Sequence, residues 1–304
     1  MDTRHLELLR LFAEYGSITA VAEVTHRTPS AVSQQVRTAE RAFDTRLLEP
    51  AGRGLRLTPA GQVLAAGGDH LAVALEQVRA RWDAFRTGPR GTVSIAALTS
   101  AATFLYAPLL RRFAGTGVDL ALHDVDVAEA SYADLTREFD IVVGHSLSGP
   151  SPADSPDLQV VPLVREPLDV AMAPGHRLAG RATVTPEDVA DEAWIGVPED
   201  FPFDTVLRSI AGAVGRDLRV VQRLRDNHLI ESLVAAGSHL AVLPRFTTPE
   251  TDAVVLRPLT GVEARRFVTA LCRPHRAQRL AVRAVLDALG EIAEDVAAAH
   301  GRGG

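Results

Sequence analysis

From residue 93 to residue 299 the chain alternates short apolar runs with stretches whose apolar residues recur at helical spacing. The runs have the length of buried strands, and many of the intervening stretches have the length of helices. The expected strands are 93–97, 118–122, 141–143, 160–163, 168–173, 194–197, 218–221, 240–243 and 267–271, and the expected helices are 101–113, 129–138, 204–214, 227–236 and 278–299. This alternation predicts an α/β fold with mostly parallel sheets, and about 210 residues are enough for two small lobes.

Ligands of such folds lie at the carboxyl ends of strands, often between two lobes. The first expected strand runs into Thr99 and Ser100, and the helix after it is expected to begin at Ala101. Free N–H groups and two hydroxyls at a helix N-terminus form a natural site for a carboxylate or a similar anion. The alternative is that both hydroxyls only cap their own helix.

The first 58 residues are mainly helical in pattern. Apolar residues from 6 to 13 recur at helical spacing, and a serine N-cap introduces a short second helix over 18–24. Thr28 and Pro29 then open a third helix, 29–43, because threonine is a good N-cap and the first turn does not need the N–H that proline lacks. Short helices joined by a tight turn are typical of a helix-turn-helix.

The third helix has one apolar face and one polar face. The polar face carries Ser30, Ser33, Gln34, Arg37 and Arg41. Short polar side chains with arginine are suited to the major groove of DNA, because they donate or accept at base edges and arginine bonds guanine bidentately. An ordinary solvated helix face is the alternative interpretation of this pattern taken alone.

Positive charge is concentrated around this helix. The formal net charge of the chain is −6, which by itself argues against a nucleic-acid partner, since phosphate binding needs a basic footprint. Between His26 and Arg56, however, six arginines stand against three acids, which leaves a local charge of +3. Two of these arginines, Arg53 and Arg56, lie on a glycine-rich segment in which leucines alternate with Arg56, the pattern of a small hairpin or wing.

One long helix is expected over 59–86, with a single apolar stripe along it. The stripe residues, separated alternately by four and three positions, are Leu64, Gly68, Leu71, Leu75, Val78, Trp82 and Phe85. This heptad spacing predicts a partner helix, because an exposed stripe of this length would be insoluble. The partner is either the rest of the chain or, as we favour, a second copy.

Several classes of protein are disfavoured by what the sequence contains. The single cysteine, Cys272, cannot form an internal disulfide and is interpreted as a small buried residue on a strand, so no metal or other cofactor is expected. No run of 18 apolar residues occurs, and the first 30 residues do not resemble an export signal. We therefore expect a cytoplasmic protein with no membrane partner.

A hydrolase is the sharpest alternative in function. The segment Gly144-His145-Ser146-Leu147-Ser148-Gly149 follows an expected strand and resembles a nucleophile elbow. That elbow requires a glycine two residues after the serine and a helix directly behind it, whereas Ser148 and then three prolines follow here. We therefore expect no enzyme and no catalytic residue. A solute-binding protein and a DNA-compacting protein fit less well, because the former has no use for a helix-turn-helix and the latter has no use for a sensor of this size.

Two stretches near the N-terminus carry the most specific residue patterns of the chain, Thr28–Arg37 with Glu40, and Arg53–Gly61. Together they resemble the LysR-type transcriptional regulators. Weaker landmarks of the same family follow at Phe139–Val143, Glu166–Leu168, Pro174–Leu178, Leu233–Gly237 and Leu240–Pro244. The sequence departs from the family in having Pro29 where glutamine is frequent, and Leu48-Glu49-Pro50 where Phe-Glu-Arg is frequent.

The resemblance implies an α/β multidomain chain with a winged helix-turn-helix over 1–58, a linker and dimerisation helix over 59–88, and a periplasmic-binding-protein-like effector domain over 91–300. Its first lobe would comprise about 91–164 and 268–300, and its second lobe about 165–267. It also implies a homodimer or homotetramer, double-stranded DNA and a small-molecule effector as partners, and RNA polymerase as a further partner.

Two sets of site residues follow. The predicted DNA contacts are Arg27, Thr28, Pro29, Ser30, Ser33, Gln34, Arg37, Arg53 and Arg56. The predicted effector contacts are Thr99, Ser100, His145 and Phe203. The last two rest on the resemblance, which places Gly144-His145, Pro198–Phe203 and the turn around Asn227 at the effector pocket.

Overall fold

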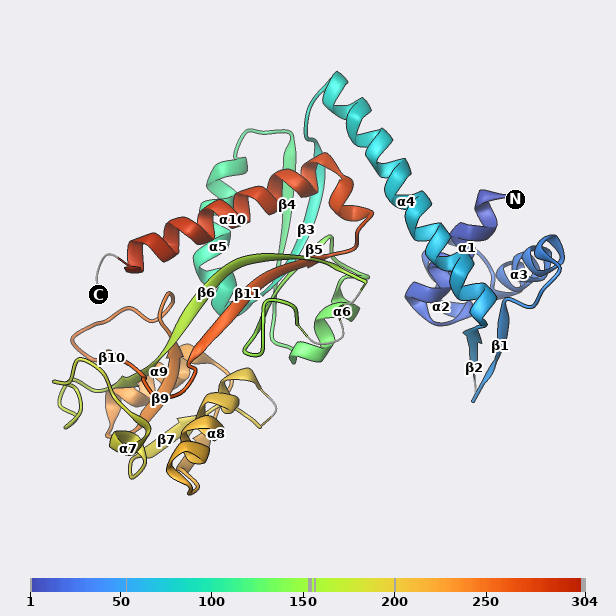
Figure 1. Ribbon diagram of the computed structural model, residues 1–304. Coiled ribbons are helices and arrows are strands. Elements are labelled where there is room, and N and C mark those ends of the chain that lie inside the picture. Colours follow the sequence, from blue (N-terminus) through green and yellow to red (C-terminus); the bar gives the residue numbers. More distant parts are fainter. Residues whose placement is uncertain (1, 53, 153–154, 156, 200, 302–304) are drawn as a thin grey trace. The chain divides into compact units, whose positions relative to one another are not determined.

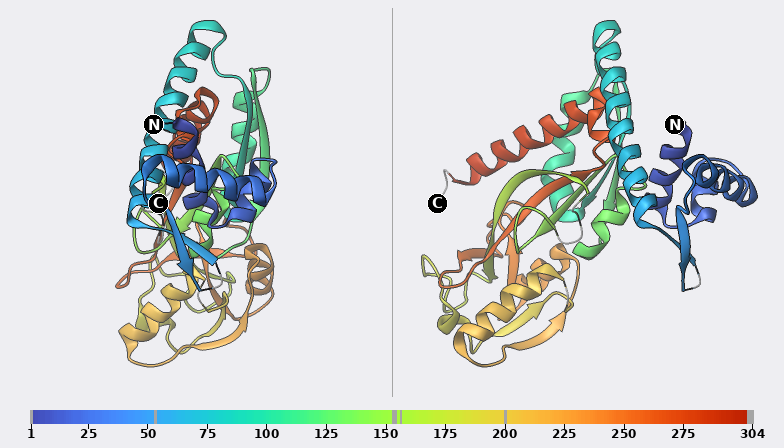
Figure 2. Two further views of the ribbon diagram at one scale, coloured as in Figure 1. Left: turned by 90° about the vertical axis from the view of Figure 1, so that its right-hand side faces the viewer. Right: turned by 45° about the vertical axis from the view of Figure 1, so that its right-hand side comes forward.

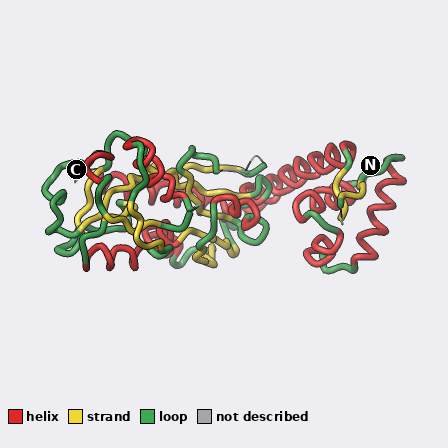
Figure 3. The backbone as a smooth tube through the Cα atoms, turned by 90° about the horizontal axis from the view of Figure 1, so that it is seen from below, coloured by secondary structure: helices red, strands yellow, loops and turns green. Residues whose placement is uncertain are grey.

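The chain divides into two compact units, one of residues 1–89 with 273–283 and one of residues 90–272 with 284–304. The computed structural model describes residues 2–52, 54–152, 155, 157–199 and 201–301. Helices dominate the first unit, whereas the described strands other than one hairpin belong to the second (Figure 3). Among the described residues, no helix combines the length and the apolar composition that crossing a bilayer requires.

Three short helices, a hairpin and a long helix form most of the first unit (Figure 1). Their bounds are α1 Thr3–Tyr15, α2 Ile18–Val24, α3 Pro29–Phe43, β1 Leu48–Ala51, β2 Gly54–Leu57 and α4 Pro59–Arg86, with a 3-10 turn, η2, at Arg276–Gln278. The hydroxyls of Ser17, Thr28 and Thr58 each accept a hydrogen bond from the backbone N–H three residues on, at 3.1, 3.2 and 3.1 Å. The helix-turn-helix, the hairpin and the long helix predicted from the sequence are confirmed.

Helices α1 and α4 pack tightly against each other at Gly68. A Cβ atom at this position would lie 2.5 Å from the backbone oxygen of Leu6 and 2.9 Å from the Cβ of Arg10, which leaves no room for a side chain. The neighbouring Gly67 has nothing within 4 Å of its own Cβ position. One glycine of the pair is therefore required by packing and the other is not.

The substitution Gly68→Ala is expected to lower the free energy of unfolding by about 1 to 3 kcal/mol, because the extra methyl forces two backbones apart. Gly67→Ala is the matched control and should be neutral or stabilising by up to about 1 kcal/mol, since alanine is the better helix former. Urea unfolding followed by far-UV circular dichroism measures both. Equal stability of the two variants would show that α1 and α4 are not in contact at Gly68.

His275 lies in the first unit beside a buried ion cluster. The guanidinium of Arg10, which is 7% exposed, donates to Glu14 at 2.8 Å and to Glu7 at 2.7 Å. Burial, and then the charge of Arg10, lower the pKa of His275 from the ordinary 6.5 to about 4. The imidazole is therefore neutral in the folded chain at pH values where the unfolded chain has already bound a proton.

Acidification from pH 6.5 to pH 4 is expected to destabilise the chain in part through His275. Between these values the unfolded state binds more protons than the folded state, so the free energy of unfolding falls as the pH falls. The measurement is the urea midpoint against pH for the wild type and for His275→Asn, which should lose less stability across this window. Parallel curves would show that His275 titrates normally in the folded chain.

The apolar stripe of α4 is exposed over its C-terminal half. The exposed fraction rises from 37% at Leu71 through 62% at Val78 to 82% at Phe85, while Gly68 is buried against α1. The rest of the unit therefore covers the stripe only near its N-terminal end.

The second unit is a mixed α/β structure. Its strands are β3 Gly91–Leu98, β4 Val118–Val125, β5 Ile141–Ser146, β6 Gln159–Met172, β7 Ala193–Gly196, β8 Arg219–Arg223, β9 Leu240–Pro244, β10 Val255–Pro258 and β11 Arg265–Cys272. Its helices are α5 Thr99–Phe113, η1 Glu129–Ser131, α6 Tyr132–Leu135, α7 Pro186–Val189, α8 Pro202–Val214 and α9 Asn227–Ala236, and it also includes most of α10, Leu280–Gly301, whose first turn belongs to the first unit. The strand order is β4-β3-β5-β11-β6-β9-β7-β8, with β10 also paired to β6.

The expectation of mostly parallel sheets holds only at the two ends of this order. Strand β3 is parallel to β4 and β5, and β7 is parallel to β8 and β9. In the centre, β11 is antiparallel to β5 and β6, and β6 is antiparallel to β9 and β10. The expectation was wrong there because, among the described residues, no crossover helix lies between β5 and β6 or between β10 and β11, and a crossover is what brings the next strand back in the parallel direction.

Strand β6 is continuous where the sequence predicts two strands. Its first part pairs with β11, and its last part pairs with β9 and β10. Val164, Arg165 and Glu166, between the two apolar runs, stay in the ladder opposite Val268, Phe267 and Arg266. Strands β6 and β11 thus run side by side between two lobes, one built on β3, β4 and β5 and the other on β7, β8 and β9, as the ribbon views show (Figures 1 and 2).

Three further differences concern helices and short elements. The helix expected over 129–138 is only η1 followed by one turn of α6, and α5 begins at Thr99 rather than at Ala101. The short elements α7 and β10 were not predicted. Cys272 is buried on β11, as expected.

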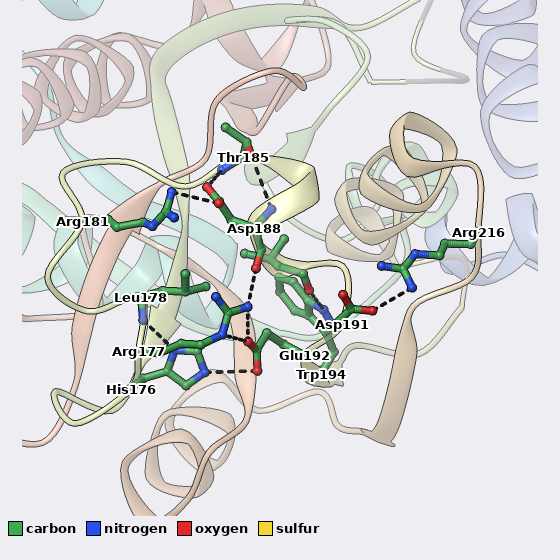
Figure 4. Close-up of polar contacts among 11 residues, drawn as sticks. His176, Arg177, Leu178, Arg181, Thr185, Asp188, Asp191, Glu192, Trp194 and Arg216 are labelled. Carbon is green, nitrogen blue, oxygen red and sulfur yellow. Dashed lines mark hydrogen bonds and ion pairs between the residues drawn. The ribbon is translucent and has the colours of Figure 1, made fainter.

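A polar cluster fastens α7 to the turn that precedes it (Figure 4). Thr185 and Asp188 form a reciprocal capping box at the start of α7. Before it, His176 Nε2 lies 3.3 Å from a carboxylate oxygen of Glu192, and Arg177 Nε donates to the other oxygen at 2.7 Å. The stretch Pro174–Leu178, which the sequence marks as a family landmark, is therefore engaged in holding this lobe together.

Candidate functional site

Helix α3 presents its polar face to solvent. Val32, Val36 and Ala39 are buried on the opposite face, where Val32 and Val36 pack with Phe12 of α1 and Val21 of α2. Of the predicted contacts, Ser33 is half-buried, and the exposed ones are Arg27, Thr28, Pro29, Ser30, Gln34, Arg37 and Arg56. Arg53 lies outside the described residues.

Three of these arginines are bonded to neighbouring side chains, two of them to neutral amides and one to a carboxylate. Arg37 donates from Nε and NH2 to the amide oxygen of Gln34 at 3.2 and 2.9 Å, and Arg27 donates to the amide oxygen of Gln35 at 2.7 Å. A neutral amide orients a guanidinium without offsetting its charge. Arg56 instead donates to the carboxylate of Glu49 at 2.8 Å, which offsets part of its attraction for a phosphate.

The second unit contains a cavity of about 220 Å³ between its lobes. All four predicted effector contacts line it. The lining residues are Leu98, Thr99, Ser100, Thr103, Val125, Asp126, Val127, His145, Val197, Phe201, Pro202, Phe203, Arg225, Asp226, Asn227, His228, Glu231, Thr247 and Thr248. The structure thus brings together residues that lie more than 100 positions apart, including the turn around Asn227.

The start of α5 is not capped by its own hydroxyls. Leu98 stands at the N-cap position, and no side chain accepts a hydrogen bond from the first turn. Ser100 Oγ is instead 2.8 Å from NH1 of Arg266. The structure therefore does not support the interpretation that Thr99 and Ser100 only cap their own helix.

A buried ion pair lies directly behind the cavity. Arg266 on β11 and Glu166 on β6 are both 0% exposed, and Nε of Arg266 donates to Glu166 Oε2 at 2.7 Å. The other carboxylate oxygen accepts the backbone N–H of Phe246 at 2.7 Å. NH1 of Arg266 also lies 3.1 Å from His145 Nδ1. Its guanidinium carbon is 5.5 Å from the ring centre of Phe203.

Sequence reasoning missed Arg266 as a site residue. It stands just before an expected strand, where a charged side chain is normally interpreted as solvated, and its partner Glu166 is 100 positions away. Glu166 was noted only as a family landmark. The one signal in the sequence that could have pointed to the pair was Glu166 itself, a carboxylate within a mostly apolar stretch.

His145 is neutral in this setting. Its side chain is 7% exposed and its ring centre lies 5.5 Å from that of Phe203. Burial, and then the charge of Arg266, hold the pKa of His145 well below its ordinary value of 6.5. The imidazole is therefore a hydrogen-bonding group at neutral pH and carries no charge.

Two family models match the chain. The model described as "Bacterial regulatory helix-turn-helix protein, lysR family" covers residues 3–62, and the model described as "LysR substrate binding domain" covers residues 86–294. The small neutral protease regulatory protein of Streptomyces coelicolor is 31% identical over 267 residues, which is 84% of this chain and 81% of that protein.

Solved structures show the same fold. A full-length OxyR variant from Pseudomonas aeruginosa superposes with a TM-score of 0.62 at 18% identity, over 95% of this chain and 94% of that one. Full-length CbnR, solved in complex with its target DNA, superposes with a TM-score of 0.54 at 17% identity, over 96% of this chain and 100% of that one.

The family models and the relative at 31% identity match both parts of the architecture, the helix-turn-helix and the mixed α/β domain. The family resemblance inferred from the sequence is thereby confirmed, and the hydrolase alternative is excluded. The chain belongs to the LysR family: it is a DNA-binding transcriptional regulator with an effector-binding domain, and not an enzyme.

Proposed function

We propose that this regulator binds a specific operator sequence and that a small anionic effector, bound between the lobes, controls its activity. The observation that supports this most strongly is the cavity, which gathers Thr99, Ser100, His145 and Phe203 around an uncapped helix N-terminus. Such a terminus carries partial positive charge and free N–H groups. We assign the DNA-binding domain to residues 1–58, the linker helix to residues 59–88 and the effector domain to residues 91–300. We also propose that the protein acts in the cytoplasm.

At the DNA, we assign α3 to the major groove. Ser30, Ser33, Gln34 and Arg37 would face base edges, and their exposed or half-exposed positions on one helix face support this. Arg27, Arg53 and Arg56 would hold phosphates. Thr28 and Pro29, at the start of α3, would also contact the DNA. Base contacts give specificity, whereas phosphate contacts set position and salt dependence.

The exposed stripe of α4 supports assembly through a second copy of the chain. A heptad seam that is left uncovered by its own unit is the normal partner of an identical seam. We therefore propose a homodimer, or a homotetramer built from two such dimers. RNA polymerase is a further partner, which the family resemblance implies.

The substitution Val78→Glu is expected to weaken this assembly by on the order of 100-fold or more in dissociation constant, because an unpaired carboxylate in a buried seam costs several kcal/mol. Val63→Glu is the matched control: Val63 lies on the same helix and is 72% exposed, but it is not on the stripe. Sedimentation velocity across a concentration series measures both. Equal sedimentation of both variants and the wild type would place the interface elsewhere.

The first test of the proposed function is a titration of a fluorescent duplex from directly upstream of the gene, against a random duplex, at several salt concentrations. We expect the upstream duplex to bind on the order of 1000-fold more tightly, with an affinity that falls steeply as salt rises. Equally weak binding of both duplexes would contradict an operator directly upstream of the gene. Pro29 and Pro50 would then be the first residues to replace with the residues that are frequent in the family.

A further inference from the structure

One buried guanidinium determines the hydrogen-bonding character of the cavity wall. NH1 of Arg266 lies 2.8 Å from Ser100 Oγ and 3.1 Å from His145 Nδ1. Arginine has N–H donors and no acceptor, and NH1 carries two hydrogens. Both contacts are therefore donated by Arg266, one hydrogen to each partner, and Ser100 Oγ and His145 Nδ1 act as acceptors.

The protons of the two acceptors must then lie on their other sides. Ser100 keeps its single hydroxyl hydrogen, which points away from Arg266. A neutral imidazole whose Nδ1 accepts a hydrogen bond carries its proton on Nε2. Among the described residues no group is in hydrogen-bond contact with this Nε2, although His145 is buried and lines the cavity.

We propose that Arg266 is a positioning residue that presents Ser100 and His145 to the cavity as two hydrogen-bond donors, so that this wall selects a carboxylate on the effector. A carboxylate offers acceptors only and matches two donors together with the free N–H groups of α5. A carboxamide of the same shape brings an N–H₂ group against one of these donors. The inference rests on the proposed function, because it concerns the same effector site.

The ion pair with Glu166 makes this arrangement possible. An unpaired guanidinium could not remain in a fully buried position, whereas the carboxylate of Glu166 binds its Nε and leaves NH1 to donate to Ser100 and His145. Glu166 is itself held by the backbone N–H of Phe246. The two donors are thus set in place before any ligand arrives, and ligand binding need not reorganise them.

The first measurement is ¹⁵N–¹H NMR of the full chain labelled with [¹⁵N]histidine at pH 7, with His145 assigned by the signal lost in His145→Gln. We expect the wild type to show a single His145 tautomer with the proton on Nε2. Removing the pair together, in Glu166→Gln/Arg266→Met, should release His145 to a mixture of tautomers, while Arg265→Met, at the exposed neighbouring position, should leave it unchanged. A proton on Nδ1 in the wild type, or a tautomer unaffected by loss of the pair, would overturn the proposal.

The second measurement is isothermal titration of the full chain with hexanoate and with hexanamide. Hexanoate should bind more tightly by on the order of tenfold, because hydrogen bonds to a charged acceptor are the stronger ones. This ratio should fall toward one in Ser100→Ala and in His145→Phe. Equal affinities in the wild type, or no binding of hexanoate, would overturn the selection of a carboxylate. DNA binding by the same preparation tests the proposed function separately, since it needs no effector.

Discussion

Replacing Glu166 with alanine is expected to lower the free energy of unfolding of the effector-binding unit by about 3 to 5 kcal/mol, the cost of leaving a buried charge without its partner. Both members of the pair are fully buried, and Glu166 also accepts the backbone N–H of Phe246. Glu166→Ala therefore strands the charge of Arg266 and one backbone donor at the same time.

The same strand offers a matched control. Arg165, next to Glu166, pairs with Glu263 at 2.8 Å, but these side chains are 46% and 63% exposed. Glu263→Ala should cost less than about 1 kcal/mol, because solvent screens such a pair. Replacing both buried partners, in Glu166→Leu/Arg266→Met, should recover most of the loss, since an apolar pair of similar size removes the unpaired charge.

Urea unfolding followed by the fluorescence of Trp194 measures these variants. Trp194 is fully buried in the second unit, and a Trp82→Phe background removes the only other tryptophan. If Glu166→Ala cost no more than Glu263→Ala, Arg266 would have to be solvated in solution, and the positioning role assigned to it would fail as well.

Arg37→Ala is expected to lower the preference for the upstream duplex over a random duplex by about 1 to 3 kcal/mol, the discrimination of one bidentate base contact. Arg37 lies on the polar face of α3, where its guanidinium is oriented by the amide oxygen of Gln34. That amide leaves the charge of Arg37 available to a guanine.

Arg27→Ala is the comparison variant for the DNA measurement. Arg27 precedes α3, is oriented by Gln35 and is assigned to a phosphate, so its loss should weaken both duplexes alike and reduce the slope of log affinity against log salt by about one. The measurement is fluorescence anisotropy with both duplexes at several salt concentrations. An unchanged ratio in Arg37→Ala would remove Arg37 from the residues that read bases.

Much of the first unit was predictable because its interactions are local. The capping hydroxyls of Ser17, Thr28 and Thr58 bond to N–H groups only three residues away. The buried face of α3 follows from helical spacing alone, and the exposed face follows with it. The exposure of the α4 stripe agrees with the heptad pattern for the same reason, since position on a helix is determined by sequence separation.

The cavity proposed for the effector was only partly predictable. Thr99 and Ser100 were found because a strand followed by a helix brings their hydroxyls to a helix N-terminus, and His145 and Phe203 were found through family resemblance. The direction of the central strands was not found, because pairing partners depend on whether a loop or a helix connects them and not on the composition of the strand itself.

Local pattern thus decided the helices of the first unit, which face of α3 meets solvent and where a strand passes into a helix that begins with two hydroxyls, because each depends on residues a few positions apart. Only the tertiary structure decided that β6 is one strand crossing both lobes, and that Arg266 on β11 meets Glu166 at zero exposure behind Ser100 and His145. The physical reason is burial. A charge is tolerated in the interior only when a partner of opposite charge lies beside it. Here that partner is 100 residues away in the sequence, and spacing along the chain does not show which distant residues will come together.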